Sequence, residues 1–180
     1  MNETAFFNAI LKFAETQLCV DTSRVFLSGF STGAFLALGL GCKFAGTSVR
    51  GVAADAGSLG LLYLEECRNG YPLPIVNFHS KSDPTIPYDG ELWIASQEEV
   101  NAVWRQRNGC NRNSSYRITF KSGTTECRRY DCPGAPVEMC AVEGLDHCWI
   151  GGRSGGFPTC VPRNDDIDAT NHLLEIFEEF

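Results

Sequence analysis

The sequence of 180 residues predicts an α/β fold, in which a mostly parallel β-sheet carries helices on both of its faces. Short apolar runs with strand character alternate along the chain with longer segments whose apolar residues recur at helical spacing. Alternation of this kind is typical of parallel sheets. No internal repeat, low-complexity tract or domain linker interrupts the pattern, so we expect residues 1–180 to belong to a single domain.

The first half of the chain supplies two helices and two strands. Residues 4–18 are expected to form an amphipathic helix, because their apolar side chains recur at helical spacing. The apolar run 25–27 predicts a buried strand, and a helix is expected after the next turn, ending near residue 44. Residues 51–57 predict a short strand that ends in small residues, whereas 58–73 predict irregular structure.

A third strand and a third helix follow. Residues 73–79 are mostly apolar and predict a strand, and the loop expected over 80–90 contains prolines that restrict its backbone. Residues 91–108 predict a helix, since several of their apolar side chains fall roughly on one side. Gly109 stands where a glycine commonly ends a helix.

The last part of the chain contains two more apolar runs and one more helix. Residues 116–121 and 137–142 predict strands, with a cysteine-rich turn region expected over 122–136 between them. A loop rich in glycine and proline is expected over 144–162. Asp168 is then placed to cap a final helix, in which apolar side chains share one face.

Charge and hydropathy exclude two classes of partner. The chain has 22 acidic and 15 basic residues, a formal net charge of −7, and no basic cluster, so nucleic acid is not an expected partner. No apolar run reaches the length of a membrane span, so no membrane partner is expected either.

Nine cysteines indicate disulfides and an oxidising compartment, so we expect an extracellular protein. Their spacing includes no Cys-x-x-Cys and does not favour zinc; no metal or organic cofactor is expected. Because nine is odd, at least one thiol is free or pairs with another chain. We expect Cys19 to bond to Cys42, and Cys148 to bond to one of three others: Cys110, Cys132 or Cys160.

One motif joins the first predicted strand to the helix after it. Gly29-Phe30-Ser31-Thr32-Gly33 follows the pattern Gly-x-Ser-x-Gly, which places a serine at the tip of a sharp strand-to-helix turn. Side chains at Gly29 and Gly33 are expected to collide with the neighbouring strand and helix. Because the bare pattern arises readily by chance, Ser31 is a candidate nucleophile only if a base and an acid accompany it.

A serine nucleophile needs a histidine base, and the chain has three histidines. His79 lies inside a predicted strand, where a packed and hydrogen-bonded role is the better interpretation, and His172 is expected at the surface of the last helix. His147 follows a strand and stands in a loop that can reach the sheet edge, so it is the candidate base.

Four aspartates compete for the role of orienting acid. Asp83 follows the third strand at its carboxyl end, where open α/β sheets place their sites, and prolines stiffen its loop. Asp146 is adjacent to His147, and neighbouring side chains usually diverge. Asp83 is therefore preferred, and the order Ser31, Asp83, His147 is the order of such triads in this type of fold. The other two competitors are Asp55 and Asp89.

These residues carry a resemblance that covers nearly the whole chain. Five stretches resemble the motifs of one group. They are the lead-in to the nucleophile turn (19–25), the nucleophile turn itself (29–33), the acid loop (79–88), a helix end (107–110) and the histidine loop (144–149). That group is the secreted feruloyl esterases and polyhydroxybutyrate depolymerases of the α/β-hydrolase superfamily. Thr32, Ala34 and Ser80 depart from the usual Asn, Gly and Gly of its motifs, which could alter the acyl pocket.

The resemblance implies a serine esterase that needs no cofactor. Ser31 would be the nucleophile, Asp83 the acid and His147 the base, with the backbone N–H of Thr32 as one donor to the oxyanion. The expected substrate is an ester, with feruloylated plant cell-wall polysaccharide as the preferred class. A polyhydroxyalkanoate or another short ester is the alternative.

The group carries strands and a glycine-rich oxyanion loop before the first helix seen here. This chain is therefore expected to be the C-terminal portion of an α/β-hydrolase, with its signal peptide and second oxyanion donor upstream. Expressed alone, it is expected to be poorly soluble or at least about a hundredfold less active. A catalytically inactive truncated fragment and a disulfide-stapled binding module are the alternatives from other classes.

Overall fold

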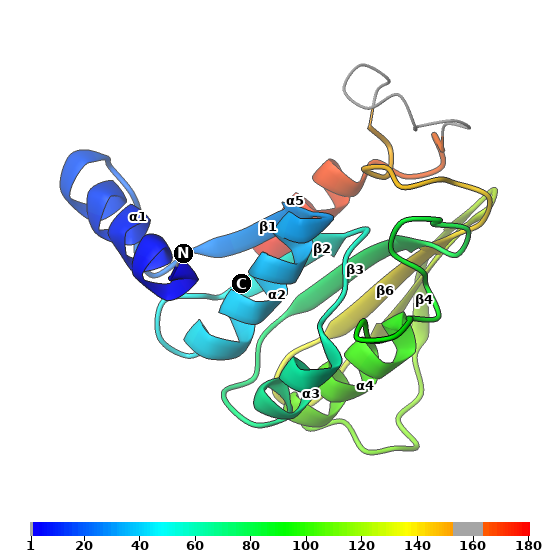
Figure 1. The fold of residues 1–180 in the computed structure, drawn as a ribbon, viewed down its shortest axis with the longest axis horizontal. Coiled ribbons are helices and arrows are strands. Elements are labelled where there is room, and N and C mark those ends of the chain that lie inside the picture. The colour runs from blue at the N-terminus through cyan, green and yellow to red at the C-terminus, as the bar shows by residue number, and fades with distance from the viewer. Residues whose placement is uncertain (1, 153–163) are drawn as a thin grey trace.

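The computed structural model describes residues 2–152 and 164–180, which form a mixed six-stranded sheet flanked by helices (Figure 1). The strands are β1 (Phe26–Phe30), β2 (Gly51–Asp55), β3 (Ile75–Ser80), β4 (Arg117–Ser122), β5 (Thr125–Tyr130) and β6 (Val137–Val142). The helices are α1 (Glu3–Gln17), α2 (Thr32–Phe44), α3 (Leu61–Arg68), α4 (Gln97–Arg107) and α5 (Ala169–Glu178). The predicted fold class, α/β with a mostly parallel sheet, is confirmed.

The sheet has the order β1-β2-β3-β6-β5-β4. Its first four strands run parallel, so β1, β2, β3 and β6 present their carboxyl ends at one edge. The last two strands form an antiparallel hairpin beside β6. The shared carboxyl edge is where the candidate site is built.

Helices cover both faces of the sheet (Figure 1). Helices α2, α3 and α4 contribute Leu38, Leu64 and Trp104 to one hydrophobic core. Helix α5 contributes Leu173 and Phe177 to a second core on the opposite face. The two cores hold β2 and β3 between them, and every residue of both strands is buried.

Three predicted elements need correction. Strand β5 lies inside the stretch 122–136, for which a turn region was expected; it was missed because three of its six residues are charged and its apolar content is low. Helix α3 lies inside the expected irregular stretch 58–73. Helix α4 begins at Gln97, six residues later than predicted, because Ser96 and Glu99 form a capping box at its start.

Helix α1 buries less of itself than its apolar periodicity predicts. Phe7 is its one buried residue and packs against Phe44 at the end of α2, with ring centroids 4.8 Å apart and the ring planes tilted by 53°. Phe6, Ile10 and Phe13 are about half exposed or more. The neighbouring strand β1 has no strand partner on its outer side among the residues that the structure describes.

The disulfides differ from the expected pairing. Cys42 bonds to Cys67, which joins α2 to α3, and Cys19 is an exposed free thiol. The expected bond between Cys19 and Cys42 is wrong, because the side of α2 that carries Cys42 faces α3.

The remaining described cysteines staple the C-terminal half. Cys110 bonds to Cys132, and Cys127 to Cys140. Cys148 is also disulfide-bonded, although not to Cys110 or Cys132 as two of the three expectations had it. The third expected partner, Cys160, lies outside the described residues. In the described part of the chain, no helix combines the length and apolar character that crossing a membrane requires.

Candidate active site

Ser31 stands at a strained turn between β1 and α2. Its backbone has φ 55° and ψ −123°, a region that residues other than glycine rarely adopt. The turn is held by the Ser31 N–H, which donates to the Asp55 carbonyl at 3.0 Å, and by the Ala34 N–H, which donates to the Ser31 carbonyl at 2.9 Å. The turn places Ser31 directly after β1, at the carboxyl edge of the sheet.

Only one of the two motif glycines is required by close packing. A Cβ atom on Gly29 would lie 2.1 Å from the carbonyl oxygen of Gly33, so no side chain fits there. A Cβ atom on Gly33 would meet nothing within 4 Å. The expectation that both glycines avoid a collision is therefore correct for Gly29 and wrong for Gly33, whose missing side chain would point away from β1.

The structure brings Ser31, His147 and Asp83 together in one hydrogen-bonded series. The Ser31 Oγ lies 2.9 Å from His147 Nε2, and His147 Nδ1 lies 2.8 Å from Asp83 Oδ2. Because a carboxylate can only accept, His147 Nδ1 carries the proton, which leaves Nε2 free to accept from the serine hydroxyl. The three side chains come from the loops after β1, β3 and β6, which end at the same sheet edge.

Backbone donors of its own loop hold the Asp83 carboxylate in addition to its contact with His147. Oδ1 accepts from the N–H groups of Thr85 and Ile86 at 2.8 and 2.9 Å. With the His147 contact, the buried carboxylate has three donors, which is the environment that suits a buried ionised group. The proline-containing loop predicted to stiffen Asp83 thus acts through the N–H groups of the residues between its two prolines.

Two further side chains hold the loop that carries His147. The Ser80 hydroxyl donates to the carbonyl of Leu145, and the Ile150 N–H donates to Asp55 Oδ2 at 2.7 Å. These contacts lie on either side of His147 in sequence, so they restrict the loop at both ends. Sequence reasoning weighed Asp55 as a rival acid and missed this anchoring role, for which the motif spacing carries no signal.

Asp55 differs from Asp83 in its surroundings. It is completely buried at the end of β2, and its Oδ1 has no hydrogen-bond partner among the described residues. Burial raises the pKa of the Asp55 carboxyl well above its usual range, with the nearby Asp83 charge adding to this and the Ile150 N–H opposing it. Burial therefore favours the neutral form of the Asp55 carboxyl.

The other two histidines have structural partners. His79 is buried in β3, its Nε2–H donates to the Ile86 carbonyl at 2.8 Å, and burial lowers its pKa, so the ring is neutral. Through this bond His79 holds the loop that carries Asp83, in agreement with the packed and hydrogen-bonded role expected of His79. His172 is only partly exposed and bonds through Nε2 to Glu138 at 2.7 Å, so the expectation of a surface residue is wrong.

Thr32 begins α2 directly after Ser31. As the first residue of the helix, it has an N–H with no acceptor inside the helix, at the end where the helix dipole favours negative charge. This is the position expected of an oxyanion donor.

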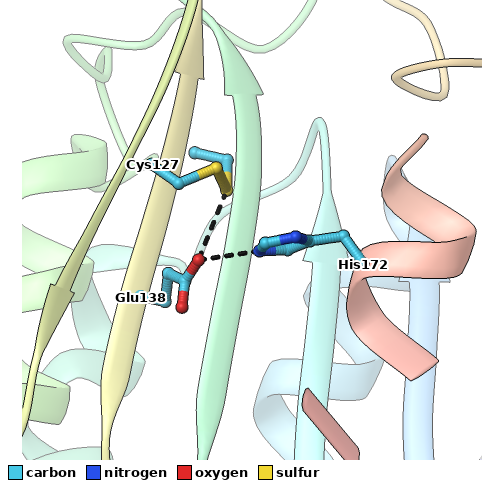
Figure 2. Close-up of side chains that lie close together, drawn as sticks. Cys127, Glu138 and His172 are labelled. Atoms are coloured by element: carbon cyan, nitrogen blue, oxygen red, sulfur yellow. Dashed lines mark hydrogen bonds and ion pairs between the residues drawn. A yellow bond between two sulfur atoms is a disulfide. The ribbon is translucent and has the colours of Figure 1, made fainter. Parts of the chain in front are cut away.

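One cluster on the α5 side of the sheet has the residue types of a metal site (Figure 2). Glu138 is buried and accepts from Thr119 at 2.8 Å and from His172, with the sulfurs of Cys127 and Cys140 beside it. The two sulfurs are joined in a disulfide, and metals bind thiolates. With this bond intact, the cluster offers a metal only one carboxylate and one imidazole, and both are already engaged with each other.

A mostly parallel sheet that carries a serine, a carboxylate and a histidine in the loops after three of its parallel strands, β1, β3 and β6, has the architecture of the α/β-hydrolases. Residues 2–115 match the phospholipase/carboxylesterase family of these proteins, and the chain belongs to that family.

Its relatives include several feruloyl esterases. A probable feruloyl esterase C of Aspergillus flavus is 30% identical over 147 residues, which are 79% of this chain and 49% of the relative. Feruloyl esterase C of Emericella nidulans is 29% identical over 143 residues, with the same two shares. Feruloyl esterase B of Piromyces equi is 24% identical over 167 residues, 86% of this chain and 30% of the relative. The resemblance to feruloyl esterases is confirmed, and the chain spans about half the length of the first two relatives.

Proposed function

We propose that this protein is a carboxylic ester hydrolase in which Ser31 is the nucleophile, His147 the general base and Asp83 the residue that orients the base. The observation that carries the proposal is the hydrogen-bonded series from Ser31 Oγ through the His147 ring to Asp83, at 2.9 and 2.8 Å. Nucleophile and base within hydrogen-bond reach, with the base oriented by a third group, is the arrangement that activates a serine.

The proposed reaction has two halves. Ser31 Oγ attacks the ester carbonyl carbon while its proton moves to His147 Nε2, and the Thr32 N–H stabilises the negative charge that develops on the carbonyl oxygen. His147 then gives its proton to the departing alcohol, which leaves an acyl group on Ser31. A water molecule, deprotonated by His147, releases the acid and restores the serine. Asp83 stabilises the imidazolium form of His147 in both halves.

The proposed substrate is a feruloyl ester of plant cell-wall polysaccharide. The names of the relatives from three fungi support this class, and the family match supports ester hydrolysis in general. A polyhydroxyalkanoate or another short ester is the alternative within the same chemistry. We further propose that the protein acts outside the cell, which its disulfides support.

Hydrolysis of methyl ferulate and of p-nitrophenyl acetate by the purified protein tests the proposal. Ser31→Ala is expected to lower kcat/KM for both esters at least about a thousandfold. Ser28→Ala is the matched control: it changes the same residue type in β1, on an exposed side chain, and should leave both rates within about twofold. A fluorophosphonate probe should add its mass to the peptide that contains Ser31.

Three outcomes would overturn the proposal: ester hydrolysis that survives in Ser31→Ala, labelling of a different serine, or a folded protein that neither hydrolyses an ester nor reacts with the probe. The last outcome would favour a catalytically inactive fragment.

A further inference from the structure

The turn between β3 and α4 has an unusual tip. Ile94 N–H donates to the Glu91 carbonyl at 2.6 Å and Glu91 N–H donates back to the Ile94 carbonyl at 3.1 Å, which leaves Leu92 and Trp93 as the two central residues. Leu92 has a positive φ of 42°. Tight turns that need a positive φ normally use Asn, Asp or Gly, so a leucine there is strained.

The strained tip places two large apolar side chains in solvent. Leu92 is 88% exposed and Trp93 is 64% exposed. Neither side chain contributes much to a core, so the sequence of this turn is poorly explained by folding stability. A backbone outlier that holds apolar side chains outward is better explained by a ligand that contacts them.

Backbone contacts tie this turn to the segment that packs against Ser31. The Leu61 N–H donates to the Trp93 carbonyl at 2.8 Å, and the Ala95 N–H donates to the Leu59 carbonyl at 2.9 Å. The same segment begins at Gly57, where an added Cβ would lie 2.8 Å from the Ser31 carbonyl oxygen. Trp93 is therefore held in a fixed relation to the candidate nucleophile.

A groove of about 540 Å³ runs from Thr32 between α2 and α3, and Trp93 forms part of its wall. Its volume suits a small organic ligand. Its wall is mainly apolar and aromatic, with Phe35 and Leu36 from α2 and Tyr63 from α3. The charged members of its lining are Glu3, Lys43 and Glu66.

We propose that this groove binds the aromatic acyl group of the ester substrate, with the rings of Trp93 and Tyr63 contacting the aromatic ring. The inference rests on the proposed function. His147 must protonate the departing alcohol, so the alcohol faces His147, whereas the groove begins at Thr32, the proposed donor to the carbonyl oxygen. The acyl group is the part of the substrate that extends from this carbonyl, and its aromatic ring suits the apolar and aromatic side chains that make up most of the groove wall.

Substrate discrimination provides the test, because a role in folding alone would affect all esters equally. Trp93→Ala should lower the ratio of kcat/KM for methyl ferulate to kcat/KM for p-nitrophenyl acetate by about tenfold or more, since the acetyl group is too short to reach Trp93. Leu62→Ala is the matched control: Leu62 is 91% exposed on α3 and lies outside the groove lining, so the ratio should stay unchanged.

Binding supplies a second measurement that does not depend on catalysis. In Ser31→Ala, calorimetry with methyl ferulate should show binding that Trp93→Ala weakens about tenfold and Leu62→Ala does not. If the proposed function fails, this measurement still tests the groove.

The inference would be overturned if Trp93→Ala left the ratio of the two kcat/KM values unchanged, or if it left the affinity for methyl ferulate unchanged. A loss in Trp93→Ala that is confined to adsorption on insoluble arabinoxylan would also overturn it, by making the turn a platform for the polymer.

Discussion

The two glycines of the Gly-x-Ser-x-Gly motif should respond in opposite ways to the same substitution. In Gly29→Ala, the new Cβ would lie 2.1 Å from the Gly33 carbonyl oxygen, 2.3 Å from its carbonyl carbon and 2.7 Å from the Ala34 nitrogen. The closest of these is 1.3 Å short of 3.4 Å, where ordinary contact begins (3.4 minus 2.1). All three contacted atoms are backbone, so no side-chain rotation can relieve the clash, and the first turn of α2 must move away from β1.

Overpacking in a core destabilises a protein by about 1–3 kcal/mol. A clash between backbone atoms and a fixed Cβ belongs at the upper end of this range, so we expect Gly29→Ala to lower the free energy of unfolding by about 3 kcal/mol. Gly33→Ala meets nothing within 4 Å and replaces a helical glycine in α2. Gly33→Ala should raise the free energy of unfolding by about 0.5 kcal/mol, since alanine restricts the unfolded chain and favours the helix.

Urea denaturation followed by circular dichroism measures both free energies of unfolding. For a protein of this size, the losses and gains correspond to a melting temperature about 6–12 °C lower for Gly29→Ala and about 1–2 °C higher for Gly33→Ala. Equal effects of the two substitutions, or a Gly29→Ala protein within 0.5 kcal/mol of the original, would refute the packing argument. Movement of α2 should also displace Ser31, so Gly29→Ala is expected to lose ester hydrolysis even where it still folds.

Two more predictions follow from strained or buried groups. Burial raises the pKa of Asp55 in the folded protein above its value in the unfolded chain, so folding takes up a proton. The protein therefore becomes less stable as pH rises from about 4 through the pKa of the folded state. Asp55→Asn should therefore become more stable relative to the original protein as pH rises over that range; a difference in unfolding free energy that is constant with pH would contradict this. Leu92→Asn should raise the unfolding free energy by about 1 kcal/mol, because asparagine tolerates the positive φ and the leucine buries little; a lower melting temperature would count against strain at this turn.

Much of the parallel half of the sheet could be predicted from the sequence, because buried parallel strands are continuous apolar runs. Strand β5 could not, since it lies at the antiparallel side and its buried positions alternate with partly or fully exposed ones. One of its buried residues, Arg129, owes its place to an ion pair with Glu179 at the end of α5. A distant partner of this kind makes a polar segment suitable for a sheet and leaves no local trace in the sequence.

The disulfides show the same limit. A sequence gives the positions of cysteines along the chain, whereas pairing depends on which side of each helix faces which neighbour. Cys42 lies on the side of α2 that faces α3, so it reaches Cys67, with the Cα atoms 4.9 Å apart. Cys19 follows α1 and lies in an exposed stretch, although both segments flank β1 in sequence. To predict the bond between Cys42 and Cys67, one must know how α2 is rotated about its own axis. Apolar periodicity defines this rotation poorly when most residues of the helix are apolar or small.

The choice between Asp55 and Asp83 depends on loop backbone rather than on strand order. The two carboxyls lie at the carboxyl ends of neighbouring parallel strands, Asp55 as the last residue of β2 and Asp83 in the loop after β3, and both contact the segment that carries His147. Asp83 accepts two N–H groups of its own loop, whereas one oxygen of Asp55 has no partner among the residues that the structure describes, and burial favours the neutral form of the Asp55 carboxyl. A neutral carboxyl beside a charged one avoids repulsion between two buried carboxylates. The two aspartates therefore divide the work proposed here: Asp83 orients the His147 ring, and Asp55 holds the loop that delivers it.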